Sequence, residues 1–377
     1  MNTVDSEVLL YIYGVICLSM IGFNLVYGLM LRGSRSRMQR RCHRFKTTVN
    51  EQLDRLSQGQ PLKKNHTRWL RRKLSHTYNL MAFDQMLDQL LWNQRQGVIR
   101  QYLLEIRGVI LGLAITYSHR ESLQAAYFAY FLYRHKIAKF MPIETIQKIL
   151  VGYMEKDSLY CRVNALKALC AFGSPEHILQ AVTVQDQGVG FLHHKILTEC
   201  LLTYGGDSTQ LIQLFWDHWG EFSSRTKLAL LNYIRFKSGD YCEKLSKILN
   251  DPKEDRELRF AAIRYFGRYS YPPVKEKLLE FAKDPSTGNW EYAAISATAL
   301  ANYPGDDVVH ALVEAMHNRN WYVRYNAAAS LEARHPDHRE LFKLVGTQDR
   351  YAREMILYRM ESCPKEKALE KEGDVAV

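Results

Sequence analysis

The sequence lacks the short motifs with which many enzymes hold a phosphate, a metal or a nucleophile. It contains no glycine-rich phosphate loop, no HExxH or GxSxG sequence, and no carboxylate pair with a supporting base. His193, His194 and His218 have no Asp, Glu or Cys partners at a spacing typical of zinc sites. These absences predict a protein without catalytic residues, without a metal and without a cofactor.

Two further absences bear on the fold and the compartment. The seven cysteines are scattered and form no CxxC pair, which argues for reduced thiols and against a disulfide framework. No window alternates polar and apolar residues convincingly, so no β-strand is expected. The chain is therefore predicted to be all-α.

Positive charge is unevenly distributed along the chain. The formal net charge is +11, and residues 32–73 contain 14 Lys and Arg against two acidic residues. The rest is close to neutral, with 37 basic and 38 acidic residues. A high isoelectric point would by itself suggest nucleic acid or anionic lipid as a partner. Because the excess charge lies in residues 32–73, only this segment is a candidate for binding nucleic acid or anionic lipid through its charge.

Residues 8–31 form an uncharged and mostly apolar run. As a helix the run would be about 36 Å long, enough to cross a bilayer. Because the head before it is acidic and no Ala-x-Ala site follows, we expect a retained single-pass anchor and not a cleaved signal peptide. The positive-inside rule places residues 1–7 outside the cell membrane and the remainder in the cytoplasm. The apolar run at 108–117 is too short to span and predicts a buried helix.

The basic residues after the anchor have three interpretations. Contact with anionic lipid head groups would fix the orientation of the anchor, and this interpretation is favoured. Nucleic acid would use the same charges, with Phe45, His66 and Trp69 as stacking groups, but no recognition motif accompanies them. A flexible linker is compatible with the Ser, Gly and Pro residues of 32–75. The predicted lipid-contacting residues are Arg32, Arg35, Arg37, Arg40, Arg41, Arg44 and Lys46.

A short segment recurs seven times between residues 145 and 361, at steps of 29 to 34 residues. In the clearest copies an Arg is followed by Ala three positions on and by an apolar residue seven positions on, as in Arg162, Ala165 and Leu169. This is helical spacing with a small residue where neighbours approach closely. A second amphipathic helix and a Gly, Pro, Asp or Ser turn lie between copies. Each unit is therefore predicted to be a pair of helices.

This pattern resembles the HEAT repeat family, in particular the short HEAT-like repeats of phycobilin lyase subunits. The residues that carry the resemblance are Asp157, Arg162, Ala165 and Leu169; Asp255, Arg259 and Ala262; Val323, Arg324, Ala327 and Leu331; and Asp349 and Arg353. The resemblance covers residues 145–361, although Ala293 stands where one Arg is expected and the copies near 195 and 225 are degenerate. It implies an α-solenoid with an extended concave face, after the single transmembrane helix. Residues 76–144 are expected to form an atypical helical cap, and 362–377 a charged, disordered tail.

Two sets of side chains in the repeats are candidates for function. The recurring arginines are either a ligand-binding ladder or structural donors to neighbouring repeats, and their recurrence at one position favours the structural role. They are Arg162, Arg225, Arg259, Arg324 and Arg353. Aromatic residues near the starts of the later second helices are typical of protein-binding hot spots, although some should pack between repeats. They are Trp290, Tyr292, Trp321, Tyr322, Tyr325 and Tyr351.

Together these features predict a non-enzymatic scaffold, anchored in a bacterial cell membrane, that binds a membrane-associated protein partner. The resemblance implies a place beside envelope or exopolysaccharide machinery, such as a glycosyltransferase. The alternative is an enzyme that handles a chromophore or another ligand on the concave face, as the lyases do.

Overall fold

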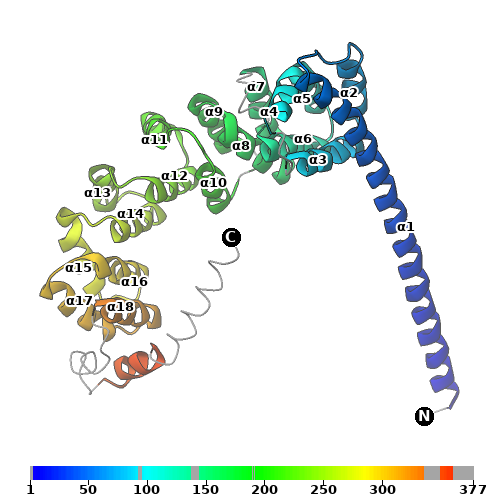
Figure 1. Cartoon of the computed structure of the whole chain (residues 1–377). Coiled ribbons are helices and arrows are strands. Elements are labelled where there is room, and N and C mark those ends of the chain that lie inside the picture. Colours follow the sequence, from blue (N-terminus) through cyan, green and yellow to red (C-terminus); the bar gives the residue numbers. More distant parts are fainter. Residues whose placement is uncertain are drawn as a thin grey trace. The chain divides into compact units, whose positions relative to one another are not determined.

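The computed structural model describes residues 3–91, 96–136, 144–188, 190, 192–334 and 349–359 (Figure 1). Within these ranges the chain is all-helical and has no β-strand, which confirms the all-α prediction. The predicted tail at 362–377 lies outside the described residues. The chain divides into two compact units, residues 1–190 with 203–206, and residues 191–202 with 207–377.

The first unit joins a long N-terminal helix to a group of short helices. They are α1 (Thr3–Ser57), α2 (His66–Leu74), α3 (Thr77–Leu91), α4 (Gln96–Glu105), α5 (Arg107–Ser118), α6 (Ser122–His135), α7 (Glu144–Gly152), the 3-10 turn η2 (Tyr153–Glu155), α8 (Leu159–Phe172) and α9 (Pro175–Gln187). α1 contacts α3 and α4, α2 contacts α5, and α6 contacts α8. Val109, Ile110 and Leu113 of α5 are buried, which confirms a buried helix at 108–117.

α1 has an exposed apolar part followed by a basic part that packs into the first unit. In the apolar part Tyr11 is 75% exposed and Leu18 71%, and the helix is long and apolar enough to cross a membrane. Further along, Phe45, Val49 and Leu53 are buried at four-residue spacing. Residues 32–57 therefore continue the same helix as the apolar run. This part of the basic segment is not a flexible linker.

Helices of two kinds alternate in the second unit, and the kinds differ in which neighbouring helices they contact. They are α10 (His194–Leu202), α11 (Ser208–Asp217), η3 (Trp219–Glu221), α12 (Ser224–Lys237), α13 (Cys242–Asn250), α14 (Arg256–Arg268), η4 (Pro272–Val274), α15 (Lys275–Lys283), α16 (Trp290–Ala299), η5 (Leu300–Asn302), α17 (Asp306–Met316), α18 (Trp321–Arg334) and a helix at 350–359. α10, α12, α14, α16 and α18 each contact the next member of that set, whereas α11, α13, α15 and α17 each contact the helix that follows in the chain.

Turn and small residues determine where these helices begin and how closely they approach. The Asp207 carboxylate accepts hydrogen bonds from two backbone N–H groups at the start of α11, and the Asp255 carboxylate accepts one from a backbone N–H at the start of α14. Gly267 lies where α14 meets α16, and a Cβ there would come within 3.1 Å of the Cα of Ala299. The sequence pattern of capping and small residues thus corresponds to real helix ends and a close helix contact.

Candidate functional site

Aromatic side chains gather on α16, α18 and the helix at 350–359. Trp321 is 42% exposed, Tyr322 57% and Tyr358 49%. The ring centroids of Trp321 and Tyr325 are 4.9 Å apart in a stacked arrangement, and those of Trp290 and Tyr322 are 5.5 Å apart. Tyr358 meets Trp321 edge-on at 6.0 Å. We call Trp290, Trp321, Tyr322, Tyr325 and Tyr358 the aromatic patch.

Polar contacts hold part of the aromatic patch in place. The Arg359 guanidinium lies 4.9 Å from the ring centroid of Tyr325 and donates a hydrogen bond of 2.8 Å to its hydroxyl. The same guanidinium pairs with Glu332 at 2.9 Å, and both side chains are largely buried. These contacts restrain the Tyr325 side chain and so limit its rotamer freedom.

Tyr292 does not belong to this surface, and its predicted role in partner binding is corrected. Its side chain is only 6% exposed and lies between Phe260 and Phe281, with centroid distances of 4.6 and 4.9 Å. Two residues after Trp290, it points about 200° around the helix and so faces inward. Tyr351 is 65% exposed, but its ring lies 5.4 Å from the guanidinium of Arg324 and not against the patch.

Tyr358 is a member of the patch that the sequence reasoning missed. It follows Tyr351 by seven residues, two helical turns, and this spacing places both residues on one face of the helix at 350–359. The signal was therefore present in the sequence. It could not show that this face meets Trp321, because the contact joins segments 37 residues apart.

Three of the recurring arginines donate hydrogen bonds to backbone carbonyls, and two of them do so in the same pattern. Arg162 donates to the carbonyl oxygens of Lys156 and Asp157, in the turn before its own helix, at 2.9 and 3.1 Å. Arg324 makes the same pair of bonds at 2.8 and 2.9 Å, and Arg259 donates to a carbonyl near the end of α13 at 3.0 Å. These bonds satisfy carbonyls at helix ends and turns, as a structural donor would. The exposed members of the set are Arg225 and Arg353.

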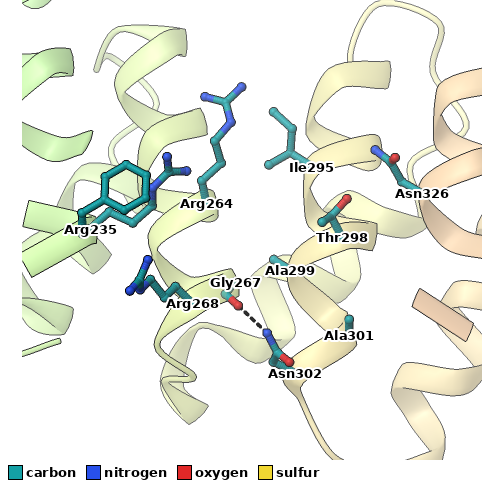
Figure 2. Close-up of a pocket in the computed structure, with 11 residues that line it drawn as sticks. Arg235, Arg264, Gly267, Arg268, Ile295, Thr298, Ala299, Ala301, Asn302 and Asn326 are labelled. Atoms are coloured by element: carbon teal, nitrogen blue, oxygen red, sulfur yellow. Dashed lines mark hydrogen bonds between the residues drawn. The ribbon is translucent and has the colours of Figure 1, made fainter. Parts of the chain in front are cut away.

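A pocket of about 810 Å³ is lined by α12, α14, α16, η5 and α18 (Figure 2). Arg235 and Phe236 come from α12, and Arg264 and Arg268 from α14. We call these four residues and the space they face the arginine pocket. None belongs to the recurring set. The sequence contains one indication of these arginines: no acidic residue lies three or four positions from Arg264 or Arg268, where it could form an ion pair along the helix.

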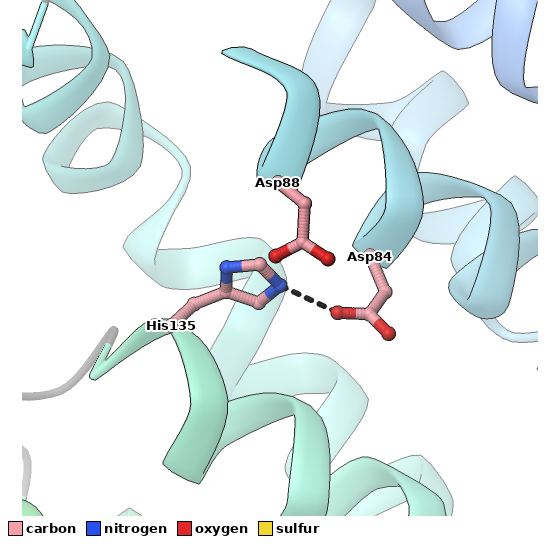
Figure 3. A group of neighbouring side chains, drawn as sticks. All are labelled: Asp84, Asp88 and His135. Carbon is pink, nitrogen blue, oxygen red and sulfur yellow. Dashed lines mark hydrogen bonds and ion pairs between the residues drawn. The ribbon is translucent and has the colours of Figure 1, made fainter. Parts of the chain in front are cut away.

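A buried polar network joins α3 to α6 in the first unit. Asp84, Asp88 and His135 place three possible ligand atoms within 4.8 Å of one another (Figure 3). Nε2 of His135 lies 2.6 Å from Oδ1 of Asp84, and the Tyr127 hydroxyl donates to its other oxygen at 2.5 Å. Arg134 forms ion pairs with both carboxylates. A cation would have to displace this guanidinium, so the geometry supports a structural role for the network.

The network also changes the acidity of Asp84. Burial by itself would raise the pKa of this carboxyl. The hydrogen bonds from His135 and Tyr127, with the charge of Arg134, outweigh burial and hold the pKa below its ordinary value. The charged form is therefore favoured in the folded state.

The predicted lipid-contacting residues all lie on α1 after its apolar part. Arg41 is half-buried, with its guanidinium 5.7 Å from the ring centroid of Tyr78. Lys46 is also half-buried. The exposed members are Arg32, Arg35, Arg37, Arg40 and Arg44.

Comparisons with known proteins assign the chain to no family. No family model matches it, and a search of curated proteins finds no significant match. The resemblance to HEAT repeats therefore stays a prediction. The features that bear on function are the aromatic patch, the arginine pocket and the exposed apolar part of α1.

Proposed function

We propose that this chain is a membrane-tethered scaffold of HEAT-like helix pairs that binds a protein partner at the cytoplasmic face of the membrane. The aromatic patch carries the proposal. Trp321, Tyr322 and Tyr358 leave large apolar rings in contact with solvent beside the buried Arg359–Glu332 pair. Trp, Tyr and Arg are the residues most enriched where partners contribute most to binding.

The exposed apolar part of α1 supports the membrane tether. So long an apolar surface is unfavourable in water and matches the thickness of a bilayer. α1 continues without a break to its first buried residue, Cys42, about 16 Å beyond Leu31 at about 1.5 Å per residue. The first unit would therefore be held at a short and fixed distance from the membrane surface.

The continuous helix narrows the set of residues that reach lipid. In a helix perpendicular to the membrane, Arg32, Arg35 and Arg37 lie within about 9 Å of Leu31, whereas Arg44 lies about 20 Å away. The head-group layer is roughly 5–8 Å thick, and charges are screened over about 8 Å. We propose that the first three arginines contact head groups and that the later basic residues face the cytoplasm.

Tethering also restricts the choice of partner. A scaffold confined to the membrane surface meets other membrane proteins at a raised effective concentration. This supports a partner within envelope or exopolysaccharide machinery, such as a membrane glycosyltransferase, as the resemblance suggests.

The proposed orientation predicts a topology defect when the first arginines are neutralised. In a variant with Arg32, Arg35 and Arg37 changed to Gln, a protease-sensitive tag at the C-terminus should become partly inaccessible from the cytoplasm, because the positive-inside bias is weakened. The matched control changes Lys63, Lys64 and Arg68 to Gln. It removes the same charge more than 30 residues from the apolar run and should leave the orientation unchanged. Equal effects in both variants would contradict the proposed tether.

The proposed partner contact predicts loss of capture when the aromatic patch is truncated. After crosslinking in native membranes, a variant with Trp321 and Tyr322 changed to Ala should recover its partner at least tenfold less efficiently, because hot-spot truncations cost about 2 kcal/mol or more each. The control changes Leu123 and Tyr160 to Ala, which are 70% and 71% exposed in the first unit. If no recovered protein depends on the patch, the scaffold proposal is wrong.

A further inference from the structure

The arginine pocket gathers three positive charges, of which Arg264 also feels the negative charge of Glu257 in the neighbouring hollow. Arg235 is half-buried near the end of α12, and Arg264 and Arg268 lie one turn apart on α14, which packs against α12. None of the three forms an ion pair or a hydrogen bond with a residue that the structure describes. The guanidinium carbons of Arg235 and Arg268 lie 4.8 and 5.5 Å from the ring centroid of Phe236.

Two other arginines of the second unit have partners within the protein. Arg256 pairs with Glu291 at 2.7 Å, and Arg324 donates to backbone carbonyls. The arginine pocket differs, because burial and the neighbouring charges of Arg264 and Arg268 lower the pKa of Arg235. A bound anion would relieve this repulsion and would meet guanidinium groups that are already gathered.

The size of the pocket indicates an extended ligand. A second hollow of about 640 Å³ shares Arg235, Phe236 and Arg264 with the arginine pocket and reaches α10. Helices pack about 8–10 Å apart, so crossing from α10 to α16 spans on the order of 25–30 Å. An extended peptide of about eight residues covers this span at about 3.4 Å per residue. Glu199 and Glu257 line the α10 side, so the positive charge is concentrated between α12 and α14.

The chemistry of the lining favours peptide carboxylates over nucleic acid. A guanidinium matches a carboxylate with two parallel hydrogen bonds. Single-stranded nucleic acid stacks its successive bases on several aromatic rings. The aromatic rings that line the two hollows are His194, on the α10 side, and Phe236, which is 44% exposed. Phe236 offers one apolar contact between charged positions and no stacking platform.

We infer that the arginine pocket binds an extended acidic segment of a partner protein, whose Asp or Glu carboxylates pair with Arg235, Arg264 and Arg268. This inference rests on the proposed scaffold function and names the chemistry of the partner. The acidic segment runs from α10 across α12 and α14 to α16, its carboxylates lie between α12 and α14, and its apolar side chains contact Phe236.

The test measures binding of a labelled peptide of eight residues, alternately Glu and Ala, to the full-length chain in zwitterionic detergent micelles. Fluorescence anisotropy at physiological salt should show saturable binding. Changing Arg264 and Arg268 together to Ala should weaken binding about 100-fold, about tenfold for each arginine. Arg319→Ala is the matched control, because it removes an exposed arginine from the turn before α18, outside the pocket, and should leave binding unchanged.

Several outcomes would overturn the inference. They are no saturable binding at millimolar peptide, an equal loss in Arg319→Ala, or tighter binding of inorganic phosphate or of an oligothymidine of equal charge. The outcome for the scaffold proposal is distinguishable from the outcome for the arginine pocket. If the peptide binds through the arginines but no protein is captured through the aromatic patch, the pocket stands without the scaffold. If patch-dependent capture persists without peptide binding, this inference alone is removed.

Discussion

Replacing Asp84 with Ala should destabilise the contact between α3 and α6 by about 3 kcal/mol, since removing a buried carboxylate leaves the hydrogen-bonding groups that face it without a partner. The Asp84 side chain is 5% exposed and that of His135 1%. Without the carboxylate, His135 and the Tyr127 hydroxyl lose hydrogen-bond partners inside the first unit. Hydrogen exchange of the α3 and α6 amides in the full-length chain would measure this loss, with α14 and α16 as an internal reference.

The same network should show a defined dependence on pH. Folding lowers the pKa of Asp84 from its ordinary value of about 3.9, so the folded state favours the charged carboxylate. Its stabilising contribution is complete above about pH 4 and is lost as pH falls through the lower, folded-state pKa. The difference in exchange between the native chain and Asp84→Ala should therefore shrink below about pH 4.

Asp88→Asn is the control for this prediction. Asp88 is 30% exposed and pairs with Arg134, which is 42% exposed, so solvent screens the interaction. The substitution should cost about 1 kcal/mol or less. Equal destabilisation by Asp84→Ala and Asp88→Asn would show that the buried hydrogen bonds of Asp84 do not hold α3 to α6.

Tyr292→Ala should destabilise the second unit by about 3–5 kcal/mol, the cost of removing a large buried aromatic side chain. The ring fills the space between Phe260 and Phe281, and the guanidinium carbon of Arg259 lies 5.0 Å from its centroid. Truncation leaves a cavity and removes both aromatic contacts. Denaturant unfolding followed by hydrogen exchange of α14 and α16 would report the loss.

Tyr292→Phe separates packing from partner binding. It keeps the ring and removes only a hydroxyl for which no hydrogen bond is found among the described residues, so stability should change by less than about 1 kcal/mol. If Tyr292→Ala kept native stability but lost the captured partner, Tyr292 would belong to the binding surface after all.

The sequence was informative where the signal is local. The length and polarity of residues 8–31 predict a helix that can cross a membrane, and the apolar residues of 108–117 predict a buried helix of the first unit. The Arg162, Arg259 and Arg324 segments each form a helix, namely α8, α14 and α18. These properties depend on neighbours within two or three helical turns, which a sequence displays directly.

The candidate sites were less accessible to the same reasoning. Trp290 and Tyr292 look alike in the sequence, yet one joins the aromatic patch and the other is buried against Phe260. Arg235 and Arg264 have no shared motif and come together only because α12 packs on α14. The sequence shows on which face of its own helix a side chain lies, because each residue adds about 100° of rotation. It does not show which other helix packs against that face.

The sequence by itself determined that this chain is helical, that one apolar run is long enough for a membrane, and that the charge excess lies beside that run. Hydrophobic length, helical periodicity and charge distribution are properties of the chain read along its length. Only the tertiary structure decided which aromatic rings remain exposed and which arginines gather in one pocket without forming an ion pair. Both depend on contacts between helices about 30 residues apart, and the packing of those helices sets solvent exposure and electrostatic surroundings.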